Sequence, residues 1–420
     1  MRSTSADAQI PAFGVYVHVP FCARRCGYCD FNTYTASDLG GGAAQAEYAD
    51  LAIKEMTLAG EVLASGADAG GLVPGLDLPW ADLPWVARPA ETVFFGGGTP
   101  TVLPASDLIK LLRAVRATWG LAGGAEVSTE ANPESVDRAY LEGLAAGGFT
   151  RVSFGMQSSS ERVLTALGRR HRPESVPRVV GWAREAGLAV TVDLIYGAPG
   201  ETMDDWAASL AAALALGVDH VSCYALTIEP GTPLAKELAA SRVNQATEED
   251  LADKYELADQ MLSGAGLAWY EISNWATPGN ECRHNLGYWQ GGDWWGFGPG
   301  AHSAIGPARF WNVAHPRDYA RAIGAGALPI ADGEVVTGSA AILERIMLGI
   351  RLREGLPKAA LTDQAEYTGQ VPAKVSSGIG QLVDDGLIED LGDAIRPTRR
   401  GRLLADVVTR EFLGALTDRD

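Results

Sequence analysis

The chain has 420 residues, of which 47% are hydrophobic and 20% charged, an ordinary balance for a globular protein with one large and one smaller domain. Its formal net charge of −18 weighs against general nucleic-acid binding, because contact with phosphates needs a basic surface, and we expect no nucleic-acid partner. The sequence contains no run of about 18 apolar residues, the length that a membrane-spanning helix needs. Residues 1–12 lack the apolar core of a signal peptide and are expected to form a short tail.

The most informative stretch follows the first predicted strand, Tyr16–Val19. Three of the five cysteines, Cys22, Cys26 and Cys29, come next with the spacing C-x3-C-x2-C. Cysteines this close together, in a chain without a disulfide framework, indicate a reducing, cytoplasmic compartment and a metal or iron–sulfur site. A cube of four irons held by three cysteines leaves one iron open to an external ligand.

Two other interpretations of the cysteines stay open on the residues alone. A structural zinc site takes four Cys or His ligands, and His18 or Cys282 would complete it. A redox C-x2-C pair is the second alternative, although it leaves the first cysteine unexplained.

Beyond the cysteines, predicted strands and helices alternate. The predicted helices are 44–64, 105–118, 159–167, 174–187 and 203–216, with Pro133 expected to begin a further one, and the predicted strands are 91–95, 126–129, 150–154, 188–196 and 220–226. This order predicts parallel strands joined by right-handed helical crossovers. We therefore expect an α/β fold with a partial parallel (β/α)6 TIM-like barrel, and an open doubly wound sheet is the alternative.

Polar or glycine-rich positions end the predicted strands. The carboxyl ends of parallel strands share one face of a barrel, so these positions are expected to converge on one site. They are Cys22, Cys26, Cys29, Gly97, Gly98, Thr99, Glu130, Gln157, Asp193 and Ala225. The run of three glycines lets a ligand approach the backbone closely. Taken singly, Glu130 and Asp193 are equally well explained as ordinary strand-end carboxylates.

The remaining segments predict a long insertion, a glycine-rich loop and a second domain. Residues 65–90 are rich in glycine and proline and indicate a surface insertion. Residues 281–300 combine five aromatics, six glycines, Cys282 and His284, which predicts a loop that buries a flat apolar surface beside a nitrogen ligand. The alternative is a cover in which His284 only caps a hydrogen bond.

Helices and a short hairpin after residue 332 predict a winged-helix-like module, whose many carboxylates favour packing or a lid over DNA binding. The expected domains are a tail at 1–12, the barrel at 13–235, a barrel extension at 236–332 and the winged-helix-like module at 333–420.

The cysteine spacing, with Tyr28 before the last cysteine, is typical of radical S-adenosylmethionine proteins. With GGGTP at 96–100, EANP at 130–133, Arg169 and VDLIYGAPGET at 192–202, the chain resembles the coproporphyrinogen dehydrogenase-like branch of that superfamily. The resemblance implies a [4Fe–4S] cluster on the three cysteines and assigns the S-adenosylmethionine pocket to Tyr16, Tyr28, Gly97, Gly98, Thr99, Glu130, Gln157, Arg169, Asp193 and Ala225.

Within that pocket, the chemistry of the side chains suggests individual partners. Arg169 is expected to meet the carboxylate of S-adenosylmethionine, Glu130 its amino group, and Asp193 the ribose hydroxyls.

Two features separate the chain from the decarboxylating enzymes of this branch. Those enzymes carry a fourth cysteine two residues after the third, where this chain has Phe31, and a long arm before the first strand. Conversely, residues 284–289 match H-N-x-x-Y-W and resemble the heme chaperone group of the branch.

The resemblance to the chaperone group implies that His284 is an axial heme ligand, and it assigns no catalytic residue. It also implies apo-hemoprotein acceptors such as respiratory proteins, an electron donor, and a homodimer as one arrangement. Oxygen-independent coproporphyrinogen III dehydrogenase, acting by radical oxidative decarboxylation, is the alternative function.

Overall fold

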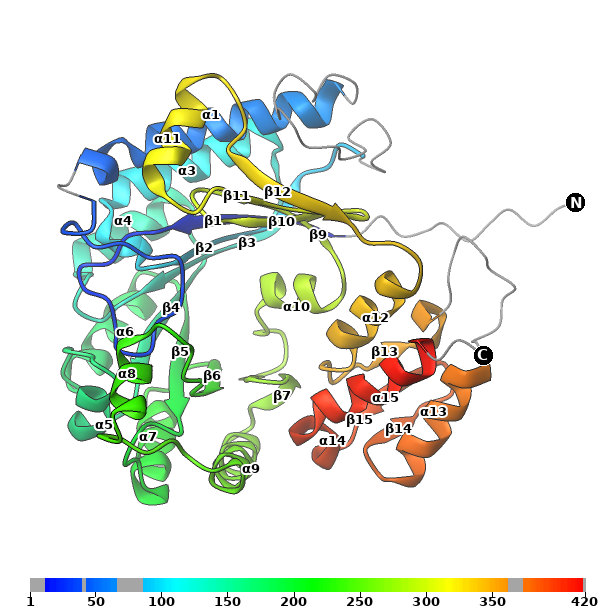
Figure 1. Ribbon diagram of the computed structural model, residues 1–420. Coiled ribbons are helices and arrows are strands. Elements are labelled where there is room, and N and C mark those ends of the chain that lie inside the picture. The colour runs from blue at the N-terminus through cyan, green and yellow to red at the C-terminus, as the bar shows by residue number, and fades with distance from the viewer. Residues whose placement is uncertain (1–11, 40–42, 66–85, 362–372, 418–420) are drawn as a thin grey trace, which may run out of the picture.

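The computed structural model describes residues 12–39, 43–65, 86–361 and 373–417, so most of the predicted insertion at 65–90 lies outside the described residues. One large sheet curves around the centre of the molecule, and helices cover its outer face (Figure 1). None of the helices in the described ranges is long and apolar enough to cross a lipid bilayer.

Six parallel strands form the main part of this sheet and lie side by side in chain order. They are β1 (Phe13–Val19), β2 (Ala90–Gly97), β3 (Leu121–Ala131), β4 (Arg151–Gln157), β5 (Ala189–Tyr196) and β6 (His220–Ala225). A doubly wound sheet would reverse its strand order at a switch point, which this sheet does not do. The predicted partial (β/α)6 barrel is therefore confirmed.

Apart from α4 (Arg138–Gly147), the helices that connect these strands match their predicted places closely. They are α1 (Ala43–Ser65), α3 (Ala105–Thr118), α4 (Arg138–Gly147), α5 (Glu161–Ala166), α6 (Ser175–Glu185) and α7 (Met203–Ala215), with a 3-10 turn at Pro100–Val102. The apolar stripe of α3 shows why: Leu108, Leu111, Leu112 and Val115 recur at helical spacing and are all buried against the sheet.

The prediction that Pro133 begins a helix was wrong. Residues 132–135 form a turn instead, in which the carbonyl oxygen of Asn132 accepts bonds from the amide and hydroxyl of Ser135 at 3.0 and 2.8 Å. Helix α4 begins at Arg138, where the Asp137 side chain accepts the amide hydrogen of Tyr140. Asp137 is the stronger start signal for a helix, because its carboxylate accepts a hydrogen bond from a free backbone amide of the first turn. The proline side chain has no hydrogen-bond acceptor and cannot do this.

Further strands extend the sheet at both edges. Beside β6 lie β8 (Asn274–Ala276) and β7 (Ala268–Glu271), and beside β1 lie β9 (Asp293–Phe297), β10 (His302–Ile305), β11 (Ala308–Asn312) and β12 (Ile330–Val335). Three helices accompany these strands: α8 (Pro233–Ala239), α9 (Glu248–Gly264) and α11 (Pro316–Gly324). Strand β9 is parallel to β1, whereas β10, β11 and β12 are joined by antiparallel pairing.

The prediction of a loop over residues 281–300 was also wrong. The segment contains helix α10 (Arg283–Trp289) and the strand β9, and α10 lies inside the curve of the sheet (Figure 1). The glycines of this segment indicated a loop, but at least Gly296 allows close packing of strands instead. A Cβ atom at this position would collide with the carbonyl oxygen of His302 on β10.

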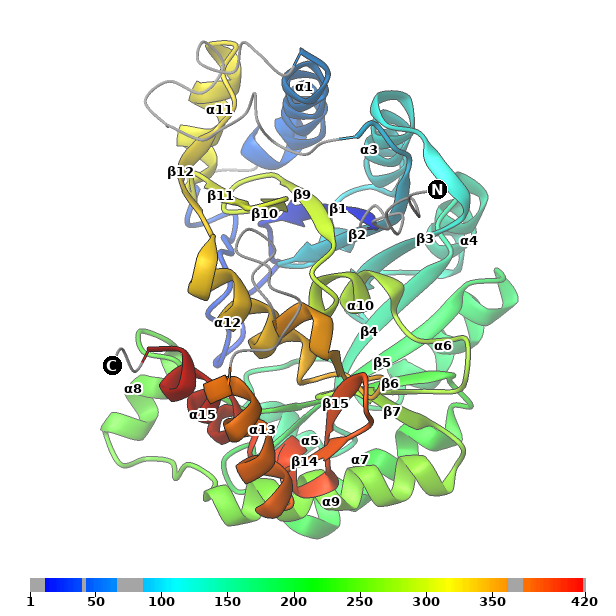
Figure 2. The same ribbon diagram turned by 90° about the vertical axis from the view of Figure 1, so that its right-hand side faces the viewer.

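The C-terminal segment has its own hydrophobic core, which includes Ile346, Leu382, Val408 and Phe412. Its elements are α12 (Gly338–Gly349), β13 (Leu356–Pro357), a 3-10 turn at Lys358–Leu361, α13 (Ala373–Asp384), β14 (Ile388–Asp390), β15 (Ala394–Pro397), α14 (Arg399–Leu403) and α15 (Ala405–Thr417). It lies across the open side of the curved sheet, where α12 contacts α10 (Figure 2).

One arginine of α14 fastens this segment to the barrel. The Arg402 guanidinium donates to both carboxylate oxygens of Asp259 on α9 at 3.0 and 2.9 Å, and it lies 4.4 Å from the ring centre of Trp269. The two charged side chains are 9% and 13% exposed. Arg399 also reaches Asp259, but its side chain is 51% exposed.

We predict that Arg402→Ala lowers the free energy of unfolding by about 3 kcal/mol, because it removes the closer and more buried of the two cations from a largely buried carboxylate. The matched variant Arg399→Ala removes an exposed contact to the same carboxylate and should cost less than about 1 kcal/mol. Urea unfolding followed by tryptophan fluorescence measures both. Equal losses in the two variants would contradict the assignment.

Candidate functional site

A cavity of about 640 Å³ opens at the carboxyl ends of the parallel strands, and we call it the cofactor cavity. Every residue predicted for the site lines it: Tyr16, Cys22, Cys26, Tyr28, Cys29, Gly97, Gly98, Thr99, Glu130, Gln157, Arg169, Asp193, Ala225 and His284. The parallel pairing of β1 to β6 brings these positions together. Which ligand group each of them contacts stays a prediction.

The cysteine loop follows β1 and folds back over the end of β2. Two backbone hydrogen bonds close it: the Cys22 amide donates to the Tyr34 carbonyl at 3.0 Å, and the Tyr34 amide donates to the Pro20 carbonyl at 2.7 Å. A Cβ atom at Gly98 would lie 2.5 Å from the Phe21 carbonyl oxygen and 3.0 Å from the Cys22 sulfur. The glycine run is therefore needed for the cysteine loop to pack here, besides any contact with a ligand.

The cysteine thiols are partly buried, and burial raises the pKa of Cys22 to about 11 and also raises the pKa of Cys29. A metal must displace these protons to bind the sulfurs, so metal binding releases protons. No three His, Cys, Asp or Glu side chains of the described ranges converge tightly enough to hold a single ion. A four-iron cube takes its ligands at separate corners and does not need such convergence.

Both candidates for a fourth zinc ligand, His18 and Cys282, are engaged elsewhere. The Asn32 carbonyl can only accept, so His18 donates to it through Nε2 at 2.9 Å, and Nδ1 accepts from the Tyr16 hydroxyl at 3.0 Å. Cys282 is buried and lies 3.5 Å from a carboxylate oxygen of Glu126. The geometry thus favours the cluster over zinc.

Arg169 links the cysteine loop to two strand ends. Its guanidinium lies 3.5 Å from the Cys26 sulfur and donates to the Asn132 side chain at 2.6 Å and to the Gly155 carbonyl at 3.0 Å. Asn132 in turn donates to the Thr99 hydroxyl at 3.0 Å. Asn132 was not among the predicted site residues, although it belongs to the EANP motif that signalled Glu130.

Two half-buried carboxylates face the cavity with few donors around them. Among the described residues Glu130 accepts a hydrogen bond only from the Gly97 amide, at 3.2 Å, and burial, reinforced by the charge of Asp193, raises its pKa to about 8. Asp193 accepts the Ser153 hydroxyl at 2.7 Å, and burial raises its pKa. Carboxylates held this way suit a ligand that brings an ammonium group and hydroxyls.

Other polar groups of the cavity also lack partners. The Ser128 hydroxyl and the Arg169 Nε are buried without a hydrogen bond among the described residues. Gln157 has a φ of 62° at an irregularity of β4, a strained conformation for a residue with a side chain. Orphaned polar atoms and backbone strain in one cavity fit a site that is completed by a bound nucleotide.

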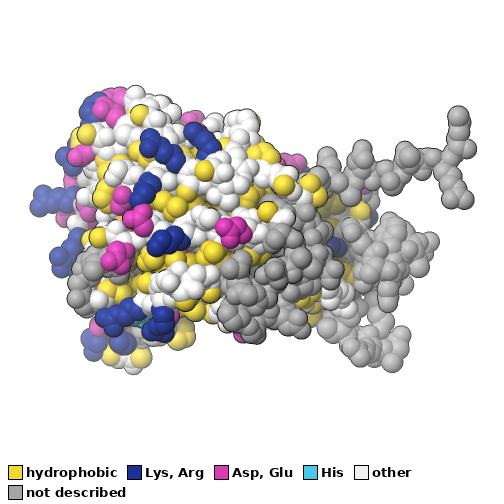
Figure 3. Space-filling model, turned by 90° about the horizontal axis from the view of Figure 1, so that it is seen from above, with side chains coloured by type: hydrophobic (Ala, Val, Ile, Leu, Met, Phe, Trp, Pro, Cys, Tyr) yellow, Lys and Arg dark blue, Asp and Glu magenta, His cyan; other side chains and the backbone are white. Residues whose placement is uncertain are grey.

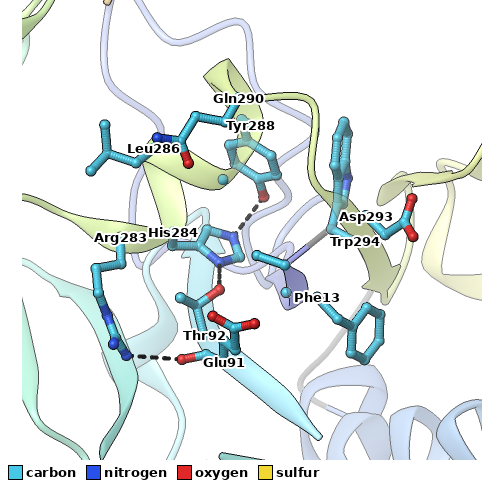
Figure 4. A pocket seen from close by; sticks show the side chains of 13 residues that line it. Phe13, Glu91, Thr92, Arg283, His284, Leu286, Tyr288, Gln290, Asp293 and Trp294 are labelled. Atoms are coloured by element: carbon cyan, nitrogen blue, oxygen red, sulfur yellow. Dashed lines mark hydrogen bonds between the residues drawn. The ribbon is translucent and has the colours of Figure 1, made fainter. Parts of the chain in front are cut away.

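His284 lies on α10 and is 3% exposed. Its Nδ1 is 2.8 Å from the Thr92 hydroxyl and its Nε2 is 2.7 Å from the Tyr288 hydroxyl (Figure 4). The imidazole stacks on Phe94, with ring centres 5.2 Å apart. Burial lowers the pKa of His284 to about 3, so the ring is neutral and keeps a nitrogen lone pair at physiological pH.

Glu126 positions the backbone of this histidine. Its carboxylate accepts the amide hydrogens of Arg283 and His284 at 3.3 and 3.2 Å, at the start of α10, and a buried Arg151 lies 3.4 Å from it. Glu126 and Thr92 were both missed from the sequence, because neither belongs to a motif and their roles depend on a contact with a segment more than 150 residues away.

A partial barrel of six parallel strands, with three cysteines after the first strand and a polar cavity at the strand ends, defines the radical S-adenosylmethionine class. Residues 81–213 match the model of the Radical SAM superfamily, and residues 336–404 match that of the HemN C-terminal domain. The solved structure of Escherichia coli coproporphyrinogen III oxidase (HemN), a radical SAM enzyme, covers 96% of this chain and 90% of its own, with a TM-score of 0.76 and 22% identity.

Curated relatives identify the particular family. The chain is 46% identical to the heme chaperone HemW of Mycobacterium tuberculosis (strain H37Rv) over 96% of this chain and 95% of the relative. It is 32% identical to HemW of Bacillus subtilis over 96% and 99% of the two chains. The chain belongs to the HemW family, which confirms the predicted family, and radical SAM membership implies a [4Fe–4S] cluster and S-adenosylmethionine.

We predict that Gly98→Ala prevents full assembly of the cluster while the fold persists, because the added methyl group meets the Phe21 carbonyl and the Cys22 sulfur. Iron and sulfide analysis after anaerobic reconstitution should find well below the wild-type content of about four irons per chain. Gly181→Ala on α6 is the control, since its added Cβ would meet nothing within 4 Å. Wild-type iron content in Gly98→Ala would refute this role of Gly98.

We also predict a pH dependence of stability from Glu130 in protein free of metal and nucleotide. Its pKa is about 8 when folded against an ordinary 4.5, so between these values the folded state holds a proton that the unfolded chain has lost. The free energy of unfolding then falls as pH rises, by at most about 1.4 kcal/mol per pH unit. The full stability is present below pH 4.5 and the loss is complete above pH 8.

Glu130→Gln should remove this slope, because glutamine can still accept the Gly97 amide but carries no charge at any pH. Urea unfolding at pH 5 and pH 8 measures the difference, and Glu61→Gln on the exposed side of α1 is the control. Parallel pH profiles for the wild type and Glu130→Gln would show that Glu130 is not buried as described.

Proposed function

We propose that this chain binds heme and transfers it to acceptor hemoproteins, and that it carries a [4Fe–4S] cluster and S-adenosylmethionine. Support comes from the relatives named heme chaperone HemW, which align over nearly the whole chain. The observation that carries the proposal is the environment of His284: a neutral, buried imidazole whose Nε2 has, among the described residues, a hydrogen bond only with the Tyr288 hydroxyl. A neutral imidazole is an ordinary axial donor to heme iron.

The cluster would be held by Cys22, Cys26 and Cys29. When bound, the cluster supplies an electron that can cleave the sulfonium bond of S-adenosylmethionine. Arg169 is suited to orient a carboxylate of the nucleotide, Glu130 to accept from its amino group, and the Asp193 carboxylate to accept from ribose hydroxyls. The buried surroundings strengthen each of these interactions by excluding water.

Thr92 and Tyr288 would determine how the imidazole is oriented and how readily its Nε2 can bind iron. The Thr92 hydroxyl at Nδ1 fixes the orientation of the ring, as outer partners of metal-bound histidines do. Coordination through Nε2 requires the Tyr288 hydroxyl to give up its bond, so Tyr288 opposes binding by the energy of one hydrogen bond, roughly 1 kcal/mol.

The partners follow from this role. They are heme, apo-hemoproteins such as respiratory proteins and a protein that donates electrons to the cluster, and a homodimer is one arrangement for the transfer. All five cysteines are free, which supports a reducing compartment such as the cytoplasm.

Oxygen-independent coproporphyrinogen III dehydrogenase is the second candidate, favoured by the likeness of the fold to HemN. Against it, the position two residues after Cys29 is Phe31, whose side chain is 60% exposed and offers no sulfur to a ligand.

We predict that His284→Ala weakens heme binding by more than about 10-fold. Loss of a residue that only supports a metal ligand already weakens binding by about this factor, and here the ligand itself is removed. The visible Soret spectrum during heme titration measures this loss, and transfer to apomyoglobin should fall with it. His302→Ala, an exposed histidine on β10, is the control and should bind normally.

An activity assay decides between the two functions. The reconstituted wild type receives coproporphyrinogen III, S-adenosylmethionine and a reductant, and the products are separated by chromatography. The chaperone proposal expects no decarboxylated product. Formation of protoporphyrinogen, or full heme binding by His284→Ala, would overturn it.

A further inference from the structure

A second cavity lies on the other side of His284, at the amino ends of β1, β2 and β9, and we call it the amino-end cavity. Its volume is about 240 Å³, and its walls include Phe13, Gly14, Thr92, Leu286 and Trp294 (Figure 4). Among the residues lining the two cavities, only His284 and Tyr288 line both. These two side chains therefore form the wall between the cofactor cavity and the amino-end cavity.

The two sides of the imidazole differ. One ring face is covered by Phe94, whose centre lies 5.2 Å away, and Tyr16 lies 6.5 Å away; both residues line the cofactor cavity. In contrast, the ring edge with Cε1 and Nδ1 faces Gly14 of the amino-end cavity, where a Cβ atom would lie 3.3 Å from each of these atoms. Aromatic rings of the cofactor cavity thus cover one face of the imidazole, whereas the ring edge toward the amino-end cavity meets a residue without a side chain.

The walls of the amino-end cavity suit a flat, largely apolar ligand whose acidic substituents lie toward Arg283. Of the two carboxylates that also line the cavity, Asp293 is paired with Arg88 and Glu91 is exposed to solvent. Phe13, Leu286, Tyr288 and Trp294 provide aromatic and aliphatic surface, and Tyr288 meets Trp294 edge to face at 4.7 Å. Arg283 is exposed and supplies a cation beside them, held by the carbonyl oxygens of Glu91 and Gly124. A guanidinium is the preferred partner of a carboxylate.

The size of the amino-end cavity also matters. Pockets that enclose a whole small molecule measure about 300–1,000 Å³, so a cavity of 240 Å³ receives only part of a macrocycle. The remainder of the ligand would stay outside, where an acceptor protein can reach it.

We propose that heme enters from the amino-end cavity and binds Nε2 of His284 in place of the Tyr288 hydroxyl, so that heme and S-adenosylmethionine occupy opposite sides of the His284–Tyr288 wall at the same time. This inference rests on the proposed function and specifies which face of the site the heme uses. It separates the transferred ligand from the nucleotide, whereas a substrate of radical chemistry would have to share the cofactor cavity.

The first test is competition in the cluster-loaded protein. Heme is titrated with and without saturating S-adenosylmethionine, and nucleotide binding is measured by calorimetry with and without heme. We expect each dissociation constant to change by less than about threefold, since neither ligand occupies the space of the other. Mutually exclusive binding would overturn the inference.

The second test uses variants of the amino-end cavity. Leu286→Glu places a charge among the apolar walls without touching the imidazole bonds, and it should weaken heme binding at least tenfold while nucleotide affinity and cluster content stay at wild-type values. Leu286→Met is the conservative control and should bind heme normally. Gly14→Ala, which crowds Thr92 and His284 from the same side, should resemble Leu286→Glu.

The outcomes distinguish this inference from the function on which it rests. If His284→Ala abolishes heme binding but Leu286→Glu does not weaken it, heme uses the other side of the wall and the inference fails alone. If His284→Ala binds heme normally, the proposed function fails as well. Circular dichroism and melting curves of each variant exclude misfolding as the cause of a loss.

Discussion

Parallel pairing of six consecutive strands is the constraint on which the site depends. It places the carboxyl ends of β1 to β6 at one edge, so that Tyr16, Glu130 and Asp193 meet in one cavity although they are far apart in the chain. Each strand alternates side chains between the core outside and the cavity inside, and most inner positions carry polar residues or glycine, with Phe94 and Ile195 as apolar exceptions. A fully closed barrel packs its interior. This partly open one keeps space for ligands.

The helix α10 turns this open barrel into two compartments. A buried ion pair, Glu126 and Arg151, attaches the helix to the strands. The Glu126 carboxylate accepts from amides at the start of the helix, and the Arg151 guanidinium donates to backbone carbonyls just before it. A buried ion pair contributes little net stability, but removal of one partner is costly. In this position its effect is geometric, because it fixes where His284 stands between the cofactor cavity and the amino-end cavity.

Much of the fold could be predicted from the sequence, because long apolar runs and helical periodicity report burial directly. Helix α3 has the predicted bounds, and the site residues marked by strand ends and motifs all line the cofactor cavity. The errors arose where a residue type has two uses. Gly296 serves close strand packing rather than a loop, and Pro133 lies in a turn that precedes the helix start at Asp137. Thr92 and Glu126 could not be found because their contacts are set by tertiary structure alone, whereas Asn132 lies in the same EANP motif as Glu130.

The central claim is that the three cysteines hold an iron–sulfur cube at the mouth of a cavity shaped for a sulfonium nucleotide. Electron paramagnetic resonance of the anaerobically reconstituted and reduced protein tests it most directly, with and without S-adenosylmethionine. The account predicts the signal of a reduced [4Fe–4S] cluster whose g-values shift when the nucleotide is added. A protein that holds zinc in place of iron, or a cluster signal that does not respond to the nucleotide, would contradict it.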